Sequence, residues 1–214
     1  NEYYDVIIHT AAVGGSRLKE DSESCIIDNV LMAANIDQRT TKRFIWFGSG
    51  VENQINNCSA YAKSKRTINE MFSGIPNCFN LRIYGVFDHN ELDTRFIKSN
   101  ILRYINYEPM QVDCSGLMDF IYMNDLIKLI DHYITEPTDK LIPEFDCVYQ
   151  STISFKNILD IINRLRDYKV DINEDRDKIK YYYSPIKQTP YNLDFTGLHQ
   201  GIKETYDELL HQHS

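Results

Sequence analysis

The first part of the chain alternates short apolar runs with longer amphipathic segments. Residues 4–12 form a β-branched run that ends in small side chains, a pattern typical of a strand buried on both faces. Residues 22–36 place Ile26, Val30, Ala33 and Ala34 at helical spacing, which predicts a helix. Further strands are predicted at 43–47 and 78–83, with a helix at 59–72 between them. This order, with short connections, predicts an α/β fold with a parallel sheet covered by helices.

Beyond residue 87 the pattern loosens, and we expect a smaller lobe with some segments returning to the sheet. Ser154 is a good N-cap for a further helix. The acidic, lysine-rich stretch 171–180 is interpreted as a solvated turn. The other elements predicted in this part are helices at 95–107, 124–134 and 201–210, and strands near 110–112 and at 119–122, 144–149 and 179–183.

Composition and charge exclude several classes of protein. The 214 residues are 43% hydrophobic and 25% charged, which fits a globular chain with a core and argues against disorder. A net charge of −8 repels nucleic acid and anionic lipid. The apolar runs are far shorter than the roughly 20 residues of a membrane helix. Five cysteines without C-x-x-C spacing and six scattered histidines favour reduced structural thiols, a cytoplasmic location and no metal site.

One pair of residues has a spacing with a chemical use. Tyr61 and Lys65 lie four residues apart in a predicted helix and therefore share a face. A nearby ammonium stabilises a phenolate, which makes the phenol a workable general acid or base for a sugar or alcohol hydroxyl. Ser49 ends a predicted buried strand, at the edge where open parallel sheets bind ligands. The ordinary alternatives are an exposed i,i+4 pair of side chains on a helix for Tyr61 and Lys65, and a turn or cap residue for Ser49.

Several stretches of the sequence match motifs of one family in order and spacing. They are D-V-I-I-H-T-A-A at 5–12, N-V at 29–30, F-G-S-G at 47–50 with Tyr61-x-x-x-Lys65, L-R-I-Y-G-V-F at 81–87 and D-F-I-Y-M-N-D at 119–125. Together they resemble the extended short-chain dehydrogenases/reductases that act on nucleoside-diphosphate sugars, the NAD-dependent epimerase/dehydratase family. The resemblance runs from at least residue 4 to 134, and the segment 193–210 is similar to the family's terminal helix.

The resemblance implies a doubly wound, Rossmann-like parallel sheet that is N-terminally incomplete. Residues 1–90 would be the C-terminal part of an NAD(P)-binding domain and 91–214 mainly a substrate-binding lobe. Tyr61 would move the proton of the sugar C4 hydroxyl, Lys65 would assist it and hold the nicotinamide ribose, and Ser49 would bind the same sugar oxygen. NAD or NADP would be lined by these two helix residues and by Thr10, Ala11, Ala12, Asn29, Ile83 and Tyr84.

The sequence also departs from the family. The G-x-x-G-x-x-G turn that holds the pyrophosphate is absent, and Gly14-Gly15 follows the wrong strand. The chain begins about where the family's fourth strand begins, so we expect either residues upstream of Asn1 or a degenerate remnant. Gly50 and Val51 stand where the 4,6-dehydratases carry an Asp-Glu pair, with Glu52 one place out of register. A dehydratase is therefore not expected, and Val51 also lacks the thiol of the 3,5-epimerase-reductases.

Other departures concern the substrate. Leu117-Met118 stands where many members have an arginine before D-F-I-Y. Arg95 and Lys98, on a helix expected to face the cleft, are predicted to bind the substrate with Ser49 and Gly50, and the alternative is a solvated helix face. The three tyrosines 181–183 could stack a base, but alternation in an edge strand explains them. His9 is interpreted as a satisfied core imidazole.

These residues predict an NAD(P)-dependent nucleotide-sugar 4-epimerase or 4-keto-sugar reductase, two reactions that share their first hydride step. The alternative is a catalytically inactive remnant or fragment with a binding or assembly role. The family pairs through helices equivalent to 21–36 and 59–72, so a homodimer is expected. A nucleoside-diphosphate sugar is the expected small-molecule partner, and nucleic acid and membranes are not.

Overall fold

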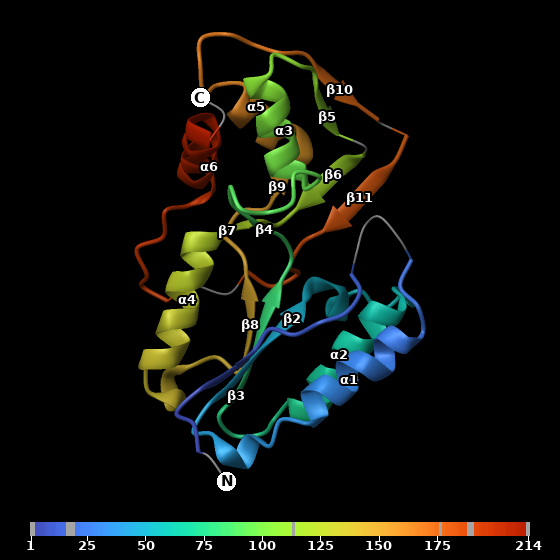
Figure 1. The fold of residues 1–214 in the computed structure, drawn as a ribbon, viewed down its shortest axis with the longest axis vertical. Coiled ribbons are helices and arrows are strands. Elements are labelled where there is room, and N and C mark those ends of the chain that lie inside the picture. Colours follow the sequence, from blue (N-terminus) through green and yellow to red (C-terminus); the bar gives the residue numbers. More distant parts are fainter. Residues whose placement is uncertain (1–2, 16–19, 113, 176, 188–190, 213–214) are drawn as a thin grey trace. The chain divides into compact units, whose positions relative to one another are not determined.

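The computed structural model describes residues 3–15, 20–112, 114–175, 177–187 and 191–212. The chain divides into two compact units. Unit 1 comprises residues 1–83 and 130–147, and unit 2 comprises residues 84–129 and 148–214. Each unit is therefore built from two separate stretches of sequence (Figure 1).

Unit 1 is organised around a four-stranded parallel sheet with the strand order β1-β2-β3-β8 (Figure 1). In the register, Ser49 lies opposite Ile83, and Ile83 lies opposite Cys147. Three strands therefore end at one edge, where the sequence had predicted chemistry. The α/β class with a parallel sheet is confirmed. The strands are β1 (Ile7–His9), β2 (Phe44–Ser49), β3 (Cys78–Ile83) and β8 (Glu144–Cys147).

Helices cover both faces of this sheet. α1 (Ser24–Ala34) and α2 (Ala60–Phe72) pack on one face, and the last turns of α4 (Met123–Thr135) cover the other (Figure 1). Ser59 caps α2 by accepting a hydrogen bond from the Ala62 amide, at 3.2 Å. The described part of unit 1 also contains the short 3₁₀ turns η1 (Gln38–Thr40), η2 (Gly50–Asn53) and η3 (Thr138–Lys140).

Alternation along the strands supplies the two halves of the unit 1 core. Phe44 and Trp46 project from β2 toward Phe72 of α2, with ring centroids 4.9 and 5.4 Å from that of Phe72. On the opposite face, Tyr133 of α4 contacts Phe79 of β3 and Phe145 of β8. Both helix layers are thus held by aromatic packing.

Two expectations about unit 1 were wrong in detail. β1 was predicted as a strand buried on both faces, but Ile8 is 38% exposed, and among the described residues β1 is an edge strand that pairs with β2. Ala34 was grouped with Ile26, Val30 and Ala33 in the apolar helical spacing, and it is exposed. The buried stripe of α1 is instead Cys25, Asn29 and Ala33, because the Asn29 amide turns inward to hydrogen-bond.

Unit 2 is built around the helices α3 (Phe96–Ile105), α5 (Phe155–Ile162) and α6 (Leu198–Gln212). Their apolar faces form one core, exemplified by Ile101 and Ile158. The small strands are β4 (Val86–Phe87) paired with β7 (Ile121–Tyr122), β5 (Met110–Val112) paired with β10 (Ile172–Glu174), and a β11-β6-β9 sheet of β11 (Ile179–Tyr182), β6 (Ser115–Met118) and β9 (Ile153–Ser154).

The sequence located the helices of unit 2 better than its strands. Ser154 accepts a hydrogen bond from the Asn157 amide at 3.1 Å, which confirms the predicted N-cap. The stretch 171–180 was predicted as a solvated turn, but it contains β10, which pairs in parallel with β5. β6 was not predicted at all. Among the described residues, no helix is long and apolar enough to cross a membrane.

Candidate active site

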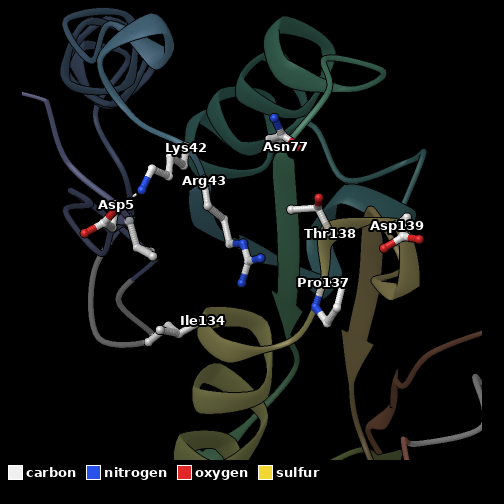
Figure 2. Close-up of a pocket in the computed structure, with 9 residues that line it drawn as sticks. Asp5, Lys42, Arg43, Asn77, Ile134, Pro137, Thr138 and Asp139 are labelled. Carbon is white, nitrogen blue, oxygen red and sulfur yellow. Dashed lines mark hydrogen bonds and ion pairs between the residues drawn. The ribbon is translucent and has the colours of Figure 1, made fainter.

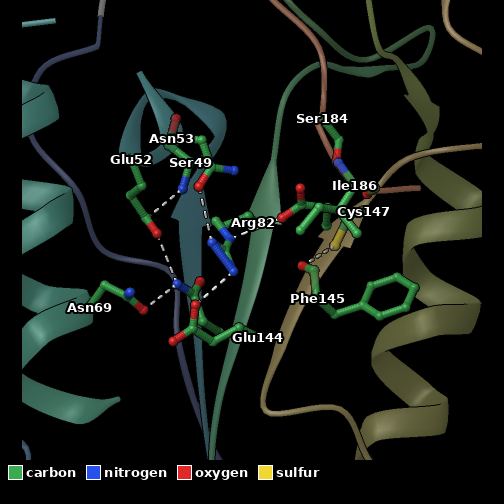
Figure 3. Close-up of polar contacts among 12 residues, drawn as sticks. Ser49, Glu52, Asn53, Asn69, Arg82, Glu144, Phe145, Cys147, Ser184 and Ile186 are labelled. Atoms are coloured by element: carbon green, nitrogen blue, oxygen red, sulfur yellow. Dashed lines mark hydrogen bonds and ion pairs between the residues drawn. The ribbon is translucent and has the colours of Figure 1, made fainter. Parts of the chain in front are cut away.

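Ser49 lies at the carboxyl end of β2, where the strand turns into η2 (Figure 3). It is 7% exposed, and its Oγ accepts a long hydrogen bond of 3.5 Å from the Val51 amide. Gly50 follows as a buried residue. Glu52 holds the Ser49 backbone, because its Oε1 accepts a hydrogen bond from the Ser49 amide at 2.8 Å. Ser49 and Glu52 therefore form a capping box that fixes the turn after the strand.

Tyr61 and Lys65 lie on the first two turns of α2 and share a face, as the spacing predicted. The Lys65 Nζ is 5.5 Å from the centroid of the Tyr61 ring and donates a 2.8 Å hydrogen bond to the Phe47 carbonyl of β2. Lys65 is 7% exposed. Burial lowers the pKa of its ammonium, while the charges of Glu52 and Cys25 raise it. The structure thus brings Tyr61 and Lys65 together, against the strand that ends in Ser49.

The loop after β1 forms the next part of this edge. Thr10, Ala11 and Ala12 are exposed directly after the strand. Gly15 has φ +72°, and a Cβ at this position would lie 3.0 Å from Cζ of Tyr61, so the loop backbone packs on the phenol ring. His9 ends β1, and burial followed by the charge of Lys65 lowers its pKa, which fits a neutral imidazole.

Asn29 holds this loop in place. It is 1% exposed, its Oδ1 accepts from the Val13 amide at 2.7 Å, and its Nδ2 donates to the Val13 carbonyl at 2.9 Å. The same Nδ2 lies 2.9 Å from the Ser64 hydroxyl of α2. The Asn29 amide, predicted to line the cofactor, is therefore already bonded to the loop and to α2.

The two residues predicted near the carboxamide have different surroundings. Ile83 is the last residue of β3 and lies next to Ser49 in the sheet register. Tyr84 belongs to unit 2, where it is 5% exposed and packs on Tyr182, with ring centroids 5.2 Å apart. Ile83 is thus at the edge that holds Ser49, and Tyr84 is a core residue of unit 2.

Arg95 and Lys98 have carboxylate partners within unit 2. Arg95 Nε lies 3.5 Å from Glu91 Oε2, and Lys98 Nζ lies 2.8 Å from Asp93 Oδ1. Lys98 also donates to the Glu91 carbonyl at 2.7 Å. Burial is the main cause that raises the pKa of Glu91, to about 7, and the Arg95 charge opposes it. The predicted role of these two cations in substrate binding stays a prediction.

Sequence reasoning assigned no function to two residues that shape this edge. Glu52 was noted only as out of register, although the S-x-x-E spacing from Ser49 is the sequence signature of a capping box. Arg66, on α2, donates to the Val51 carbonyl at 3.4 Å, to the Gln54 carbonyl at 3.3 Å and to the Asn57 carbonyl at 2.7 Å. It therefore ties the loop between Ser49 and Tyr61 to the helix, and no local motif signals that contact.

A pocket lies at the other end of the strands (Figure 2). It has a volume of about 540 Å³, and Asp5, Lys42 and Asn77 on its wall precede β1, β2 and β3. Lys42 is paired with Asp5, and Arg43 donates to the carbonyls of Tyr133 and Glu136 near the end of α4. Lys42 and Arg43 in this pocket therefore already have partners within the chain. The pocket is separate from the edge that holds Ser49.

A family comparison decides how these residues are interpreted. The model of the NAD dependent epimerase/dehydratase family matches residues 1–147, which is more than half of the chain. The chain belongs to this family. No curated protein sequence matches it. In this family the enzymes are epimerases and reductases, and their cofactor is NAD or NADP.

Solved structures share the fold at low sequence identity. UDP-N-acetylglucosamine 4-epimerase from Bacillus cereus aligns with a TM-score of 0.75 at 16% identity, covering 97% of this chain and 80% of that one. UDP-glucuronic acid 4-epimerase from Bacillus cereus, in complex with UDP-glucuronic acid and NAD, gives 0.72 at 16%, covering 97% and 76%. A GDP-L-fucose synthetase from Naegleria fowleri bound to NADP gives 0.69 at 18%, covering 97% and 77%.

The residues at this edge fit the nicotinamide and ribose half of the family cofactor. Small exposed side chains at 10–12 leave the end of β1 open, and a hydroxyl, a phenol and an ammonium follow on β2 and α2. Such a donor set suits a ribose and a carboxamide. The sequence offers no glycine turn for the pyrophosphate. Within the described part of the chain, no three His, Cys, Asp or Glu side chains are arranged to hold a metal.

Proposed function

We propose that the chain acts on nucleoside-diphosphate sugars at C4, as an NAD(P)-dependent 4-epimerase or 4-keto-sugar reductase, with Tyr61 as the proton carrier. The observation that carries the proposal is the position of Lys65. Its ammonium is fixed on the Phe47 carbonyl of β2, 5.5 Å from the Tyr61 ring, and the same strand ends in Ser49. UDP-sugar 4-epimerases and a GDP-L-fucose synthetase among the structural matches support the substrate class.

Each residue has a role that follows from its chemistry. The Lys65 ammonium, close to the ring, stabilises a phenolate at Tyr61, so that this oxygen can accept the proton of a C4 hydroxyl. Ser49 presents a hydroxyl at the strand end that can donate to the same sugar oxygen as its charge develops. A bound nicotinamide supplies the hydride chemistry. Thr10, Ala11, Ala12 and Ile83 would lie along the bound nicotinamide at the sheet edge.

The test is the substitution Tyr61→Phe, which removes the phenolic oxygen and keeps the ring against Gly15. The assay follows interconversion of UDP-sugars with NAD, and reduction of 4-keto sugars with reduced nicotinamide, by chromatography of the nucleotide sugars. Loss of a positioned acid/base typically lowers the rate about 10²- to 10⁴-fold. Nucleotide-sugar binding should survive. The control is Tyr107→Phe, at a residue that is 72% exposed in unit 2. Equal turnover in Tyr61→Phe, or none in the native protein, contradicts the proposal.

The proposal extends to assembly and location. α1 carries Ile27 and Leu31, one turn apart and 62% and 54% exposed, on the helix that packs against α2. Burial of these two side chains against a second copy would support a homodimer formed through α1 and α2. The five cysteines are free, which supports the cytoplasm as the site of action.

A further inference from the structure

Glu52 is a buried carboxyl next to Ser49 of the candidate site (Figure 3). It is 9% exposed and both oxygens are bonded: Oε1 accepts from the Ser49 amide at 2.8 Å, and Oε2 from Asn80 Nδ2 at 2.9 Å. Asn80 is itself held by Asn69 of α2, at 2.7 Å. A carboxyl in this position is expensive to ionise, because burial removes it from water. The presence of a buried carboxyl at this position therefore indicates a role that an apolar side chain could not fill.

The strand makes room for Glu52 through a glycine. A Cβ on Gly48 would lie 2.5 Å from Glu52 Oε1 and 2.1 Å from Asn80 Oδ1, closer than real Cβ contacts. Any side chain at this position would displace the carboxyl or the amide. The position of Glu52 is thus built into β2, immediately before Ser49.

Two cations act on Glu52, and their situations differ. Arg82 of β3 already has two carboxylates of β8, with Nη2 2.7 Å from Glu144 Oε2 and Nε 2.9 Å from Asp146 Oδ1. Lys65 of α2 has no carboxylate in ion-pair contact among the described residues, and its hydrogen bond goes to a neutral carbonyl. The carboxyl whose charge favours the Lys65 ammonium is Glu52.

We propose that Glu52 is a positioning residue for the site: it fixes the Ser49 backbone and, once it is ionised, supplies the negative charge that favours a protonated Lys65 beside Tyr61. This rests on the proposed function, because it assigns the electrostatic support of the same Ser-Tyr-Lys set. Other titratable groups face Lys65 as well. They are His9 of β1, Cys25 of α1 and Tyr61 of α2, whereas the groups facing Glu52 are Arg82 and Lys65.

Glu52→Gln separates the charge from the shape. Glutamine retains an oxygen that can accept the Ser49 amide hydrogen, so a purely structural role for Glu52 leaves the protonation of Lys65 unchanged. The readout is the titration of Lys65, followed by carbon-13 NMR of labelled lysine side chains, with the Lys65 signal assigned by its loss in Lys65→Arg. The matched control is Glu70→Gln, because Glu70 is an exposed glutamate on α2, the helix that carries Lys65.

We expect the Lys65 midpoint in Glu52→Gln to move to lower pH by about half a unit or more, because the variant removes a partly screened negative charge that favours the ammonium. Glu70→Gln should leave it in place. An unchanged midpoint in a folded Glu52→Gln protein overturns the proposal. Trp46 fluorescence reports folding of unit 1, because Trp46 is the single tryptophan and lies in β2.

If Glu52→Gln does not fold, titration of Lys65 in the native protein still tests the proposal. The Lys65 signal should then show a second inflection where Glu52 ionises, and a curve without one overturns the proposal. His9 is followed by its own ring signals, and an inflection that coincides with His9 counts against Glu52. Where the native protein turns over a nucleotide sugar, the Glu52→Gln substitution should lower kcat more than it changes KM. A shifted Lys65 midpoint together with full activity of Tyr61→Phe would support the coupling of Glu52 to Lys65 and refute the proposed reaction.

Discussion

The stability of unit 1 should depend on pH through Glu52. Burial is the main cause that raises the pKa of Glu52 from 4.5 to about 7, and the Ser49 amide, Asn80, Arg82 and Lys65 act against it. The unfolded chain ionises this carboxyl near pH 4.5, whereas the folded chain keeps its proton up to about pH 7. Between these values the folded state binds more protons, so its stability must fall as the pH rises.

The magnitude follows from the same two pKa values. Each pKa unit corresponds to 1.36 kcal/mol, so ionising Glu52 in place removes about 3 kcal/mol of folding free energy between pH 4.5 and pH 7. Glu52→Gln has no proton to lose in this range. The difference in unfolding free energy between the two proteins should therefore change by about 3 kcal/mol in favour of the variant as the pH rises.

Urea unfolding at a series of pH values, followed by Trp46 fluorescence, measures this difference for unit 1. Other titratable groups, such as His9 and Glu91, are common to both proteins, so their contributions cancel in the comparison. Glu70→Gln should show no pH-dependent difference from the native protein. A constant difference between native protein and Glu52→Gln from pH 4.5 to pH 8 would refute the reasoning, because a desolvated carboxyl must give a slope.

Three further predictions concern other parts of the chain. Asn29→Ala strands the Val13 amide and should destabilise unit 1 by about 1–3 kcal/mol, measured by urea unfolding, with less than 0.5 kcal/mol contradicting the loop-holding role. In unit 2, burial raises the pKa of Asp125, but hydrogen bonds from Tyr149, Gly197, Thr196 and Lys128 hold it below its ordinary value. Asp125→Asn should therefore lose stability at neutral pH and approach the native protein in acid, as thermal melts at pH 3 and 7 would show; a pH-independent loss contradicts this. Leu31→Glu should convert the proposed dimer to monomers in light scattering, and Leu92→Glu, at a 71% exposed residue of unit 2, is its control.

The sequence predicted those parts of the fold that local patterning determines. The helix at 59–72 and the strand at 78–83 were located closely because capping and alternation are local signals. β6 and β10 were not, since S-G-L-M and I-N-E have little strand character of their own. They are strands because β11 and β5 pair with them, and pairing between distant segments leaves little trace in either segment alone.

The same limit applies to the site. The pairing of Tyr61 with Lys65 followed from helix geometry, and the structure brings their side chains together. The inward turn of Asn29 did not, because it depends on Val13 and Ser64 from two other elements. Nor could spacing show that Lys98 has a carboxylate partner in the preceding loop. Polar contacts between elements depend on the packed fold, and motif spacing describes only one element at a time.

The interleaving of the two units constrains the order in which the chain can fold. β3 pairs with β8 from Asn80 opposite Glu144 to Ile83 opposite Cys147, and residues 84–129 of unit 2 are synthesised between them. On the ribosome, β1 to β3 and their helices emerge before β8, so one side of β3 stays open until β8 appears. Unit 2 in turn waits for residues 148–214. Because each unit is built from two separate stretches, cutting the chain at one position cannot separate unit 1 from unit 2. Neither unit is complete until its second stretch has been synthesised. A late step that brings these distant stretches together is therefore expected to limit the folding rate.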